Sequence, residues 1–207
     1  MMRIFRLAGF GALGALATVS PLPLSGFALA QAASTQDAPA QAAPAQAAPK
    51  METFGTWSTI VDEVDTGEDV RKTCAASTAF LDASGTSGTL TLAISNGDAL
   101  PPDGYPTLVI AMKNKELPTG ENIPAVFGDA NSKVKATVNT ISDAGGQWMM
   151  NNKTETSLAL LRAMRRASAL DVTFADKPVA TVSMDGFTKA YRSLGMSCGF
   201  PTGDVAP

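Results

Sequence analysis

Apolar and polar side chains alternate along much of the chain after residue 54. Between Thr86 and Ser95, Leu90, Leu92 and Ile94 alternate with threonines and an alanine. Such alternation places the apolar side chains on one face of a strand. We therefore predict strands over residues 54–64, 70–80, 86–95, 107–112, 134–141, 148–150, 170–174 and 179–183, whereas prolines at 101, 102, 106, 118 and 124 divide the rest of 96–125 into turns.

Toward the C-terminus the apolar spacing changes to steps of three and four, which is the helical period. One helix is predicted to begin at a Thr154 or Thr156 cap and to end near Arg166. A second is predicted from Asp185, as N-cap, to Gly195. Their inward-facing residues are Leu158, Leu161 and Met164 in the first helix, and Phe187, Ala190, Tyr191 and Leu194 in the second.

Mostly strands, followed by two late helices, predict a mainly β protein. The expected architecture is a β-sandwich with two helices in its C-terminal third. It occupies residues 54–200, and residues 201–207 are expected to form a disordered tail.

The first thirty residues have the three parts of a secretory signal peptide. Arg3 and Arg6 provide a positive start, residues 7–19 are uncharged and apolar, and residues 28–30 read Ala-Leu-Ala. The apolar run is shorter than the roughly 20 residues that cross a bilayer as a helix. We therefore expect cleavage near Ala30 and no transmembrane segment afterwards, with an uncleaved anchor as the alternative. The mature protein would lie in the periplasm or at the outer membrane and cell surface.

Residues 31–53 are rich in alanine, proline and glutamine. This composition cannot form a packed core, so the segment is predicted to be a flexible spacer. It is either a tether that holds the domain away from a surface or a tolerated remnant of the leader.

The composition excludes several chemistries. The 207 residues include no histidine, which removes Ser-His-Asp and Cys-His catalysis and every histidine-based metal site. A net charge of −3 argues against nucleic acid as a partner. No metal or cofactor site is predicted.

Several short segments match catalytic or metal-binding motifs, but their sequence context does not fit those motifs. Residues 195–199 match Gly-x-Ser-x-Gly but follow a helix and lack a histidine. Residues 132–135 match Ser-x-x-Lys but open a strand. The acidic residues 62–69 lack the spacing of a calcium loop, and Met149 and Met150 are expected to fill the core.

Cys74 and Cys198 are the two cysteines of the chain. In an exported protein an isolated pair is more often a structural disulfide than a reactive site. A redox role would favour the Cys-x-x-Cys spacing, which is absent. We predict a bridge that fastens the second helix to the sheet.

Three stretches resemble the invasion-associated locus B family of exported bacterial proteins. They are Phe54-Gly55-Thr56-Trp57, then Trp148 with the helix ending at Arg166, and Ser183-Met184-Asp185-Gly186-Phe187-Thr188-Lys189-Ala190-Tyr191 leading to Cys198. Many members carry further cysteines, so this chain resembles a single-disulfide branch. The resemblance implies an immunoglobulin-like β-sandwich in which Trp57, Trp148, Gly186, Phe187 and Tyr191 are structural motif residues. It supplies no catalytic residues.

Our first hypothesis is therefore a non-enzymatic envelope or surface protein that acts through protein contacts, in host-cell interaction for pathogenic family members. Its partner would be another envelope or host-surface protein. The alternative is a periplasmic carrier or sensor of a small ligand, with a pocket between the sheet and the late helices. The third hypothesis is a hydrolase that uses carboxylates alone.

Overall fold

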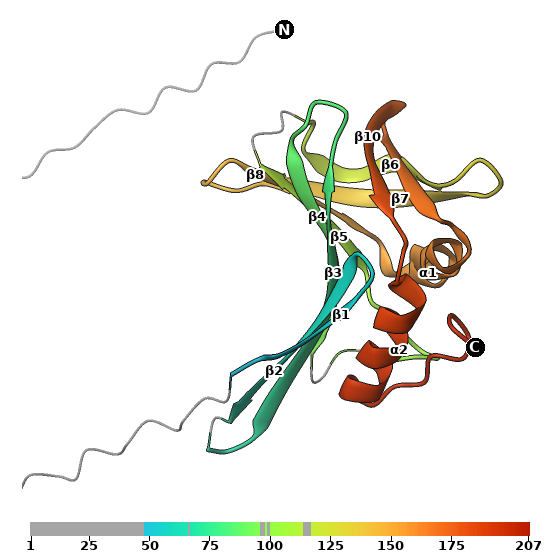
Figure 1. Cartoon of the computed structure of the whole chain (residues 1–207). Helices are drawn as coiled ribbons and strands as arrows, with labels where there is room; N and C mark the ends of the chain where they lie inside the picture. Colours follow the sequence, from blue (N-terminus) through green and yellow to red (C-terminus); the bar gives the residue numbers. More distant parts are fainter. Residues whose placement is uncertain (1–47, 66, 96–97, 99, 114–116) are drawn as a thin grey trace, which may run out of the picture. The chain divides into compact units, whose positions relative to one another are not determined.

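The computed structural model describes residues 48–207 apart from 66, 96–97, 99 and 114–116 (Figure 1). The predicted signal peptide, its cleavage site and residues 31–47 of the spacer lie outside the described residues. The strands are β1 (Lys50–Phe54), β2 (Trp57–Asp65), β3 (Val70–Leu81), β4 (Ser87–Ser95), β5 (Leu108–Lys113), β6 (Gly120–Gly128), β7 (Lys133–Ser142), β8 (Gln147–Asn152), β9 (Ala169–Phe174) and β10 (Lys177–Ser183). The helices are a 3₁₀ turn over Thr154–Thr156, α1 (Ser157–Arg166) and α2 (Phe187–Cys198).

The ten strands form one antiparallel sheet in the order β1-β2-β3-β4-β5-β8-β7-β6-β9-β10. The sheet is strongly curved, and both helices lie on its concave side (Figure 1). Curvature brings β10 into contact with β3, which is seven places away in the strand order. The mainly β class and the two C-terminal helices are confirmed. The strands belong to one continuous sheet, so the topology does not show a sandwich of two sheets.

The predicted alternation sets the core. Leu90, Leu92 and Ile94 of β4 are buried, and they share the inner face with residues of the neighbouring strands such as Ala76 and Ile110. Both helices pack on this face with their apolar sides. One core serves the whole sheet, because the buried residues form one cluster from Trp57 to Ala206.

Two strands differ from the prediction. The expected first strand is a hairpin, in which β1 and β2 are joined at Gly55 and Thr56, so the sheet begins at Lys50 and takes residues 50–53 from the expected spacer. Strand β6 was expected to be turns because of its prolines. Pro124 is accommodated because β6 pairs with β9 only from Ala125 onward.

The ends of the second helix also differ. Gly186, with a φ of +88°, occupies the N-cap position in place of Asp185. Gly195 lies inside the helix and Gly199, with a φ of +74°, caps its end, so Cys198 is the last helical residue. The first helix begins after Thr156 as predicted, although the threonine hydroxyl makes no capping bond to the helix backbone.

The last residues pack against the domain, in contrast to the disordered tail predicted for 201–207. Val205 and Ala206 are only 0% and 2% exposed. Arg162 donates from Nε to the Asp204 carbonyl at 2.9 Å, and Arg192 donates from Nε to the Ala206 carbonyl at 3.0 Å. The C-terminal segment is therefore part of the core.

Neither helix in the described part of the chain has the length and apolar character needed to cross a membrane.

Candidate functional site

The predicted disulfide is present. Cys74 on β3 and Cys198 at the end of α2 are bonded, with their Cα atoms 6.2 Å apart. Cys74 is fully buried on the inner face of the sheet. The bond therefore fixes the end of α2 to a central strand, and it is consistent with an oxidising compartment.

The first and third family-like stretches contact each other. Trp57 donates from its indole Nε1 to the Ser183 carbonyl at 3.1 Å, and the backbone N–H of Thr56 donates to the Asp185 carbonyl at 3.0 Å. Gly186 completes this junction, because a Cβ there would lie 1.7 Å from the Phe54 carbonyl oxygen. The two motifs thus form one joint between the β1–β2 turn and the start of α2.

The aromatic motif residues form the interior of this joint. The Trp57 and Phe187 rings are 5.1 Å apart edge to face, and the Tyr191 ring lies 5.9 Å from that of Phe187. The second tryptophan, Trp148, belongs to another cluster with the Phe174 ring at 5.8 Å. The four motif aromatics are at most 1% exposed, so they belong to the interior of the domain.

A polar cluster joins the C-terminal segment to this core. The Tyr105 hydroxyl donates to the Asp204 carboxylate, and this hydrogen bond, with partial burial, raises the pKa of the Tyr105 phenol. The Tyr191 hydroxyl and Asp204 Oδ1 are buried without a hydrogen-bond partner. Burial, reinforced by the Asp204 charge, raises the pKa of the Tyr191 phenol.

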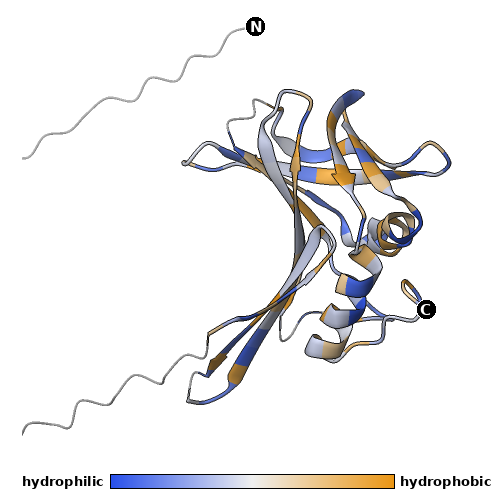
Figure 2. Ribbon diagram, in the orientation of Figure 1, coloured by the Kyte–Doolittle hydropathy of each residue, from blue (hydrophilic) through white to orange (hydrophobic). Residues whose placement is uncertain are grey.

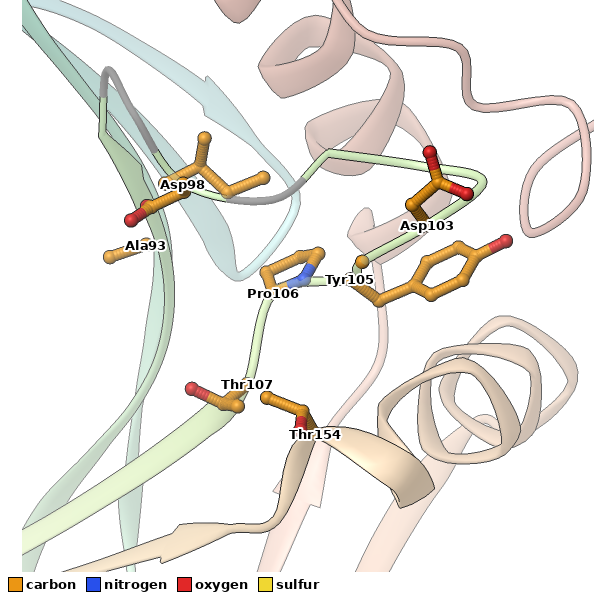
Figure 3. A pocket seen from close by; sticks show the side chains of 9 residues that line it. Ala93, Asp98, Asp103, Tyr105, Pro106, Thr107 and Thr154 are labelled. Atoms are coloured by element: carbon orange, nitrogen blue, oxygen red, sulfur yellow. The ribbon is translucent and has the colours of Figure 1, made fainter.

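A pocket of about 320 Å³ lies beside Tyr105, between the sheet and the turn before α1. Figure 3 shows the Tyr105 ring directed away from Thr107 and Thr154. The two carboxylates that line the pocket, those of Asp98 and Asp103, belong to residues exposed to solvent. The pocket gives the carboxylate hydrolase hypothesis no specific support.

The other chemical-looking motifs agree with the prediction only in part. The Gly-x-Ser-x-Gly match does not follow a helix, because Gly195 to Cys198 are the last residues of α2 itself. Ser197 is on the last turn of α2, and Lys133 opens β7. In the acidic hairpin, Lys72 pairs with Glu63 at 2.9 Å, and this contact lowers the pKa of the glutamate. Met150 is buried in the core as predicted, but Met149 is half-buried on the opposite side of β8, so the prediction is wrong for Met149 because neighbouring strand residues face opposite sides. No group of three metal-ligating side chains occurs within the described ranges.

Asn152 is a structural residue that the sequence analysis missed. It is 1% exposed, and its Oδ1 accepts from the Leu108 N–H at 2.7 Å while Nδ2 donates to the Ser157 hydroxyl at 3.1 Å. These bonds join β5, β8 and the first turn of α1. The sequence offered one indication of this role: Asn152 continues the inward positions of Trp148 and Met150, where a polar side chain needs hydrogen-bond partners.

The outer, convex side of the sheet carries an uncharged face. Successive strands place their outward side chains in two cross-strand rows, fixed by the register of β2, β3, β4, β5, β8 and β7. In Figure 2 much of β3 and β4 is pale, the colour of intermediate hydropathy. We define the uncharged face as these two rows: Ser58, Ser77, Thr91, Val109 and Asn151, and Ala79, Thr89, Ala111, Met149 and Ile141.

Neither of the described helices covers this face, because both lie on the concave side (Figure 1). Ile141 is 56% exposed there, while Val109 and Met149 are half-buried by their neighbours. Charged residues resume beyond it: Lys113 is the next outward residue after Ala111 on β5, whereas on β2 Asp62 follows one further uncharged position, Ile60. Among the surfaces of the described residues, this face is the best candidate for binding another protein.

No family model, curated protein or solved structure matches this chain. The resemblance to invasion-associated locus B proteins stays a prediction.

Proposed function

We propose that this protein is an exported, non-enzymatic envelope or surface module that acts through protein contacts, as the family resemblance implies. It works in the periplasm or at the outer membrane after loss of residues 1–30. Its partner is another envelope or host-surface protein. The export signal in the sequence and the buried Cys74–Cys198 bond support this placement.

The uncharged face is the observation that carries the proposal. Burying a charge is costly unless it is paired, and the centres of protein interfaces are depleted of charged residues. Ten outward side chains in two rows, none of them charged, can therefore be desolvated against a partner at low cost. Their spread over six strands of the convex side suits a broad protein surface better than a small molecule.

The immunoglobulin-like sandwich belongs to the same proposal. Its support is the curvature that brings β10 back beside β3, with Trp57 bonded to Ser183 across the gap. In this proposal the two ends of the curved sheet face each other as the two layers of a sandwich. The strands in the middle of the sheet order keep the two layers hydrogen-bonded in one sheet.

Site-specific photo-crosslinking in intact cells tests the function. A photoreactive amino acid replaces Thr91, at the centre of the uncharged face, in the full chain. We expect a discrete adduct with an envelope or host-surface protein. A second change, Val109→Lys, places a charge on the adjacent strand and should abolish the adduct without preventing the disulfide.

The matched control places the same photoreactive group at Ala144, in the exposed β7–β8 turn. It should give no adduct with that protein. Equal adducts from both positions, or an adduct that survives Val109→Lys, would contradict binding through the uncharged face.

A further inference from the structure

A second feature of the outer side lies beyond the uncharged face, where β7, β6 and β9 run side by side. These strands enclose a hollow of about 370 Å³. Unlike the uncharged face, the hollow has two lysines on the β7 side and two aspartates on the β9 side. A third aspartate, Asp129, lines it from the β6–β7 turn, where its Oδ1 accepts from the Asn131 and Ser132 N–H groups at 2.8 and 2.7 Å. It is independent of the protein contacts proposed above.

Strand register explains the separation of charge. Lys133 on β7 and Asp171 on β9 both pair with Gly128 on β6, so they lie in one cross-strand row on either side of a glycine. Two strand spacings put their Cα atoms roughly 10 Å apart. Gly128 contributes no side chain to fill the row, and its backbone approach requires glycine, since a Cβ would lie 2.0 Å from the Ser132 carbonyl oxygen.

The neighbouring cross-strand row also has a lysine on β7, but its central residue on β6 is a valine instead of a glycine. Lys135 on β7 and Thr173 on β9 both pair with Val126, which is half-buried. The hollow therefore has two lysines along one wall, an aspartate and a threonine along the other, and a small apolar floor. Asp176, in the β9–β10 turn, adds a second carboxylate to the acidic side.

The charges of the hollow do not neutralise one another. The ion pairs among the described residues join Arg71 with Asp69 and Lys72 with Glu63, so neither lysine of the hollow takes part in one. Asp171 is oriented by the Thr181 hydroxyl, which donates to its Oδ1 at 2.7 Å. Opposite charges are thus held apart at fixed strand positions with space between them.

We infer that this hollow binds a short peptide with free ends. A carboxylate end would accept from Lys133 and Lys135, and an ammonium end would donate to Asp171 and Asp176. An extended chain spans about 3.3–3.6 Å per residue, so two residues place their charged ends roughly 7 Å apart. A dipeptide can therefore contact both walls, because the Lys133 and Asp171 side chains extend toward each other from Cα atoms roughly 10 Å apart. A single amino acid is too short to reach both walls. The shallow floor favours small side chains.

Isothermal titration of the oxidised mature chain with dialanine tests the inference. We expect saturable binding that weakens as salt is added, because the contacts are charged and exposed. Blocking either end, in N-acetyl-dialanine or dialanine amide, should weaken binding about tenfold or more, since each removes hydrogen bonds to a charged group. Free alanine should bind more weakly than dialanine for lack of reach.

Two variants locate the site. Lys133→Gln combined with Lys135→Gln, and separately Asp171→Asn, should each weaken dialanine binding about tenfold or more. Lys113→Gln and Glu68→Gln remove exposed charges elsewhere and should leave binding unchanged. All of these side chains lie on the surface, so the fold should survive, as a retained disulfide and circular dichroism spectrum would show.

Absence of saturable binding would overturn the inference. So would equal binding of the blocked peptides, equal binding of alanine, or equal loss in the control variants. None of these results bears on the crosslinking at Thr91, so the two proposals fail separately.

Discussion

Gly186 shows how a single residue joins the two family-like motifs. Its φ of +88° is left-handed, and a Cβ would lie 1.7 Å from the Phe54 carbonyl oxygen. We expect Gly186→Ala to lower the free energy of unfolding by about 3 kcal/mol or more, because backbone strain and a backbone clash add. Urea denaturation measures the change.

Gly146→Ala is the matched control for that prediction. Gly146 has a similar φ of +73°, but a Cβ added there would have nothing within 4 Å. Its substitution should cost only the strain, about 1–2 kcal/mol. Equal losses in the two variants would contradict the contact between the β1–β2 turn and the start of α2.

The buried Tyr191 hydroxyl predicts an effect of alkaline pH. Its raised pKa means that the folded protein holds this proton more tightly than the unfolded chain. Stability from this group is therefore full below the unfolded pKa of about 10 and falls as pH rises above it. Because the hydroxyl has no hydrogen-bond partner, Tyr191→Phe should preserve or raise stability at pH 7 and reduce the alkaline fall.

Tyr105→Phe is the contrasting variant. It removes the hydrogen bond to Asp204 and should lower the free energy of unfolding at pH 7 by about 1 kcal/mol. Denaturation of both variants at pH 7 and in alkali checks the two signs. A large loss in Tyr191→Phe at pH 7 would show that its hydroxyl is bonded after all.

At the scale of elements, helix α2 depends on the disulfide. Replacing Cys74 and Cys198 by serine should lower the free energy of unfolding by roughly 2–5 kcal/mol. Because the bond holds the last turn of α2 to β3, amide exchange should accelerate more in Phe187–Cys198 than in Ser87–Ser95. Equal acceleration in both elements, measured by mass spectrometry, would contradict this local role.

Elements with a local signal were predictable from the sequence. The alternation of Leu90, Leu92 and Ile94 and the helical spacing around Tyr191 both correspond to buried faces. Strand β6 was missed because Pro124 argues against a central strand, and only its pairing partners show that the proline lies outside the β9 ladder. The packed position of Val205 was missed because the C-terminal segment is held by distant residues, Arg162 of α1 and Arg192 of α2, which bond to its backbone carbonyls.

The candidate sites also include some residues that the sequence identifies and some that only the fold brings together. Residues marked by chemistry or motif, such as Cys74, Cys198 and Trp57, were identifiable in advance. The uncharged face and the hollow at Gly128 arise from register between strands distant in sequence, and local periodicity carries no information about register partners. Alternation indicates which side of each strand faces outward, but not which outward residues become neighbours.

At the scale of the whole molecule, one sheet runs from β1 to β10 with a single core. A continuous ladder gives no boundary at which half of the domain can unfold alone. The fluorescence of the two tryptophans can show whether both ends of the sheet unfold together. Trp57 lies in the joint with α2, and Trp148 packs against Phe174 of β9. We therefore predict a single cooperative unfolding transition.

The variants Trp57→Phe and Trp148→Phe leave one tryptophan each and test that prediction. Each loses an indole hydrogen bond, to the Ser183 or the Pro118 carbonyl respectively, so the two midpoints need not agree with each other. Within each variant, however, the fluorescence and far-ultraviolet circular dichroism transitions in urea should coincide, because the remaining tryptophan and the strands unfold together. If fluorescence of Trp57 changed at lower urea than the dichroism of the same variant, the joint with α2 would be opening before the sheet, and the single-core description would fail.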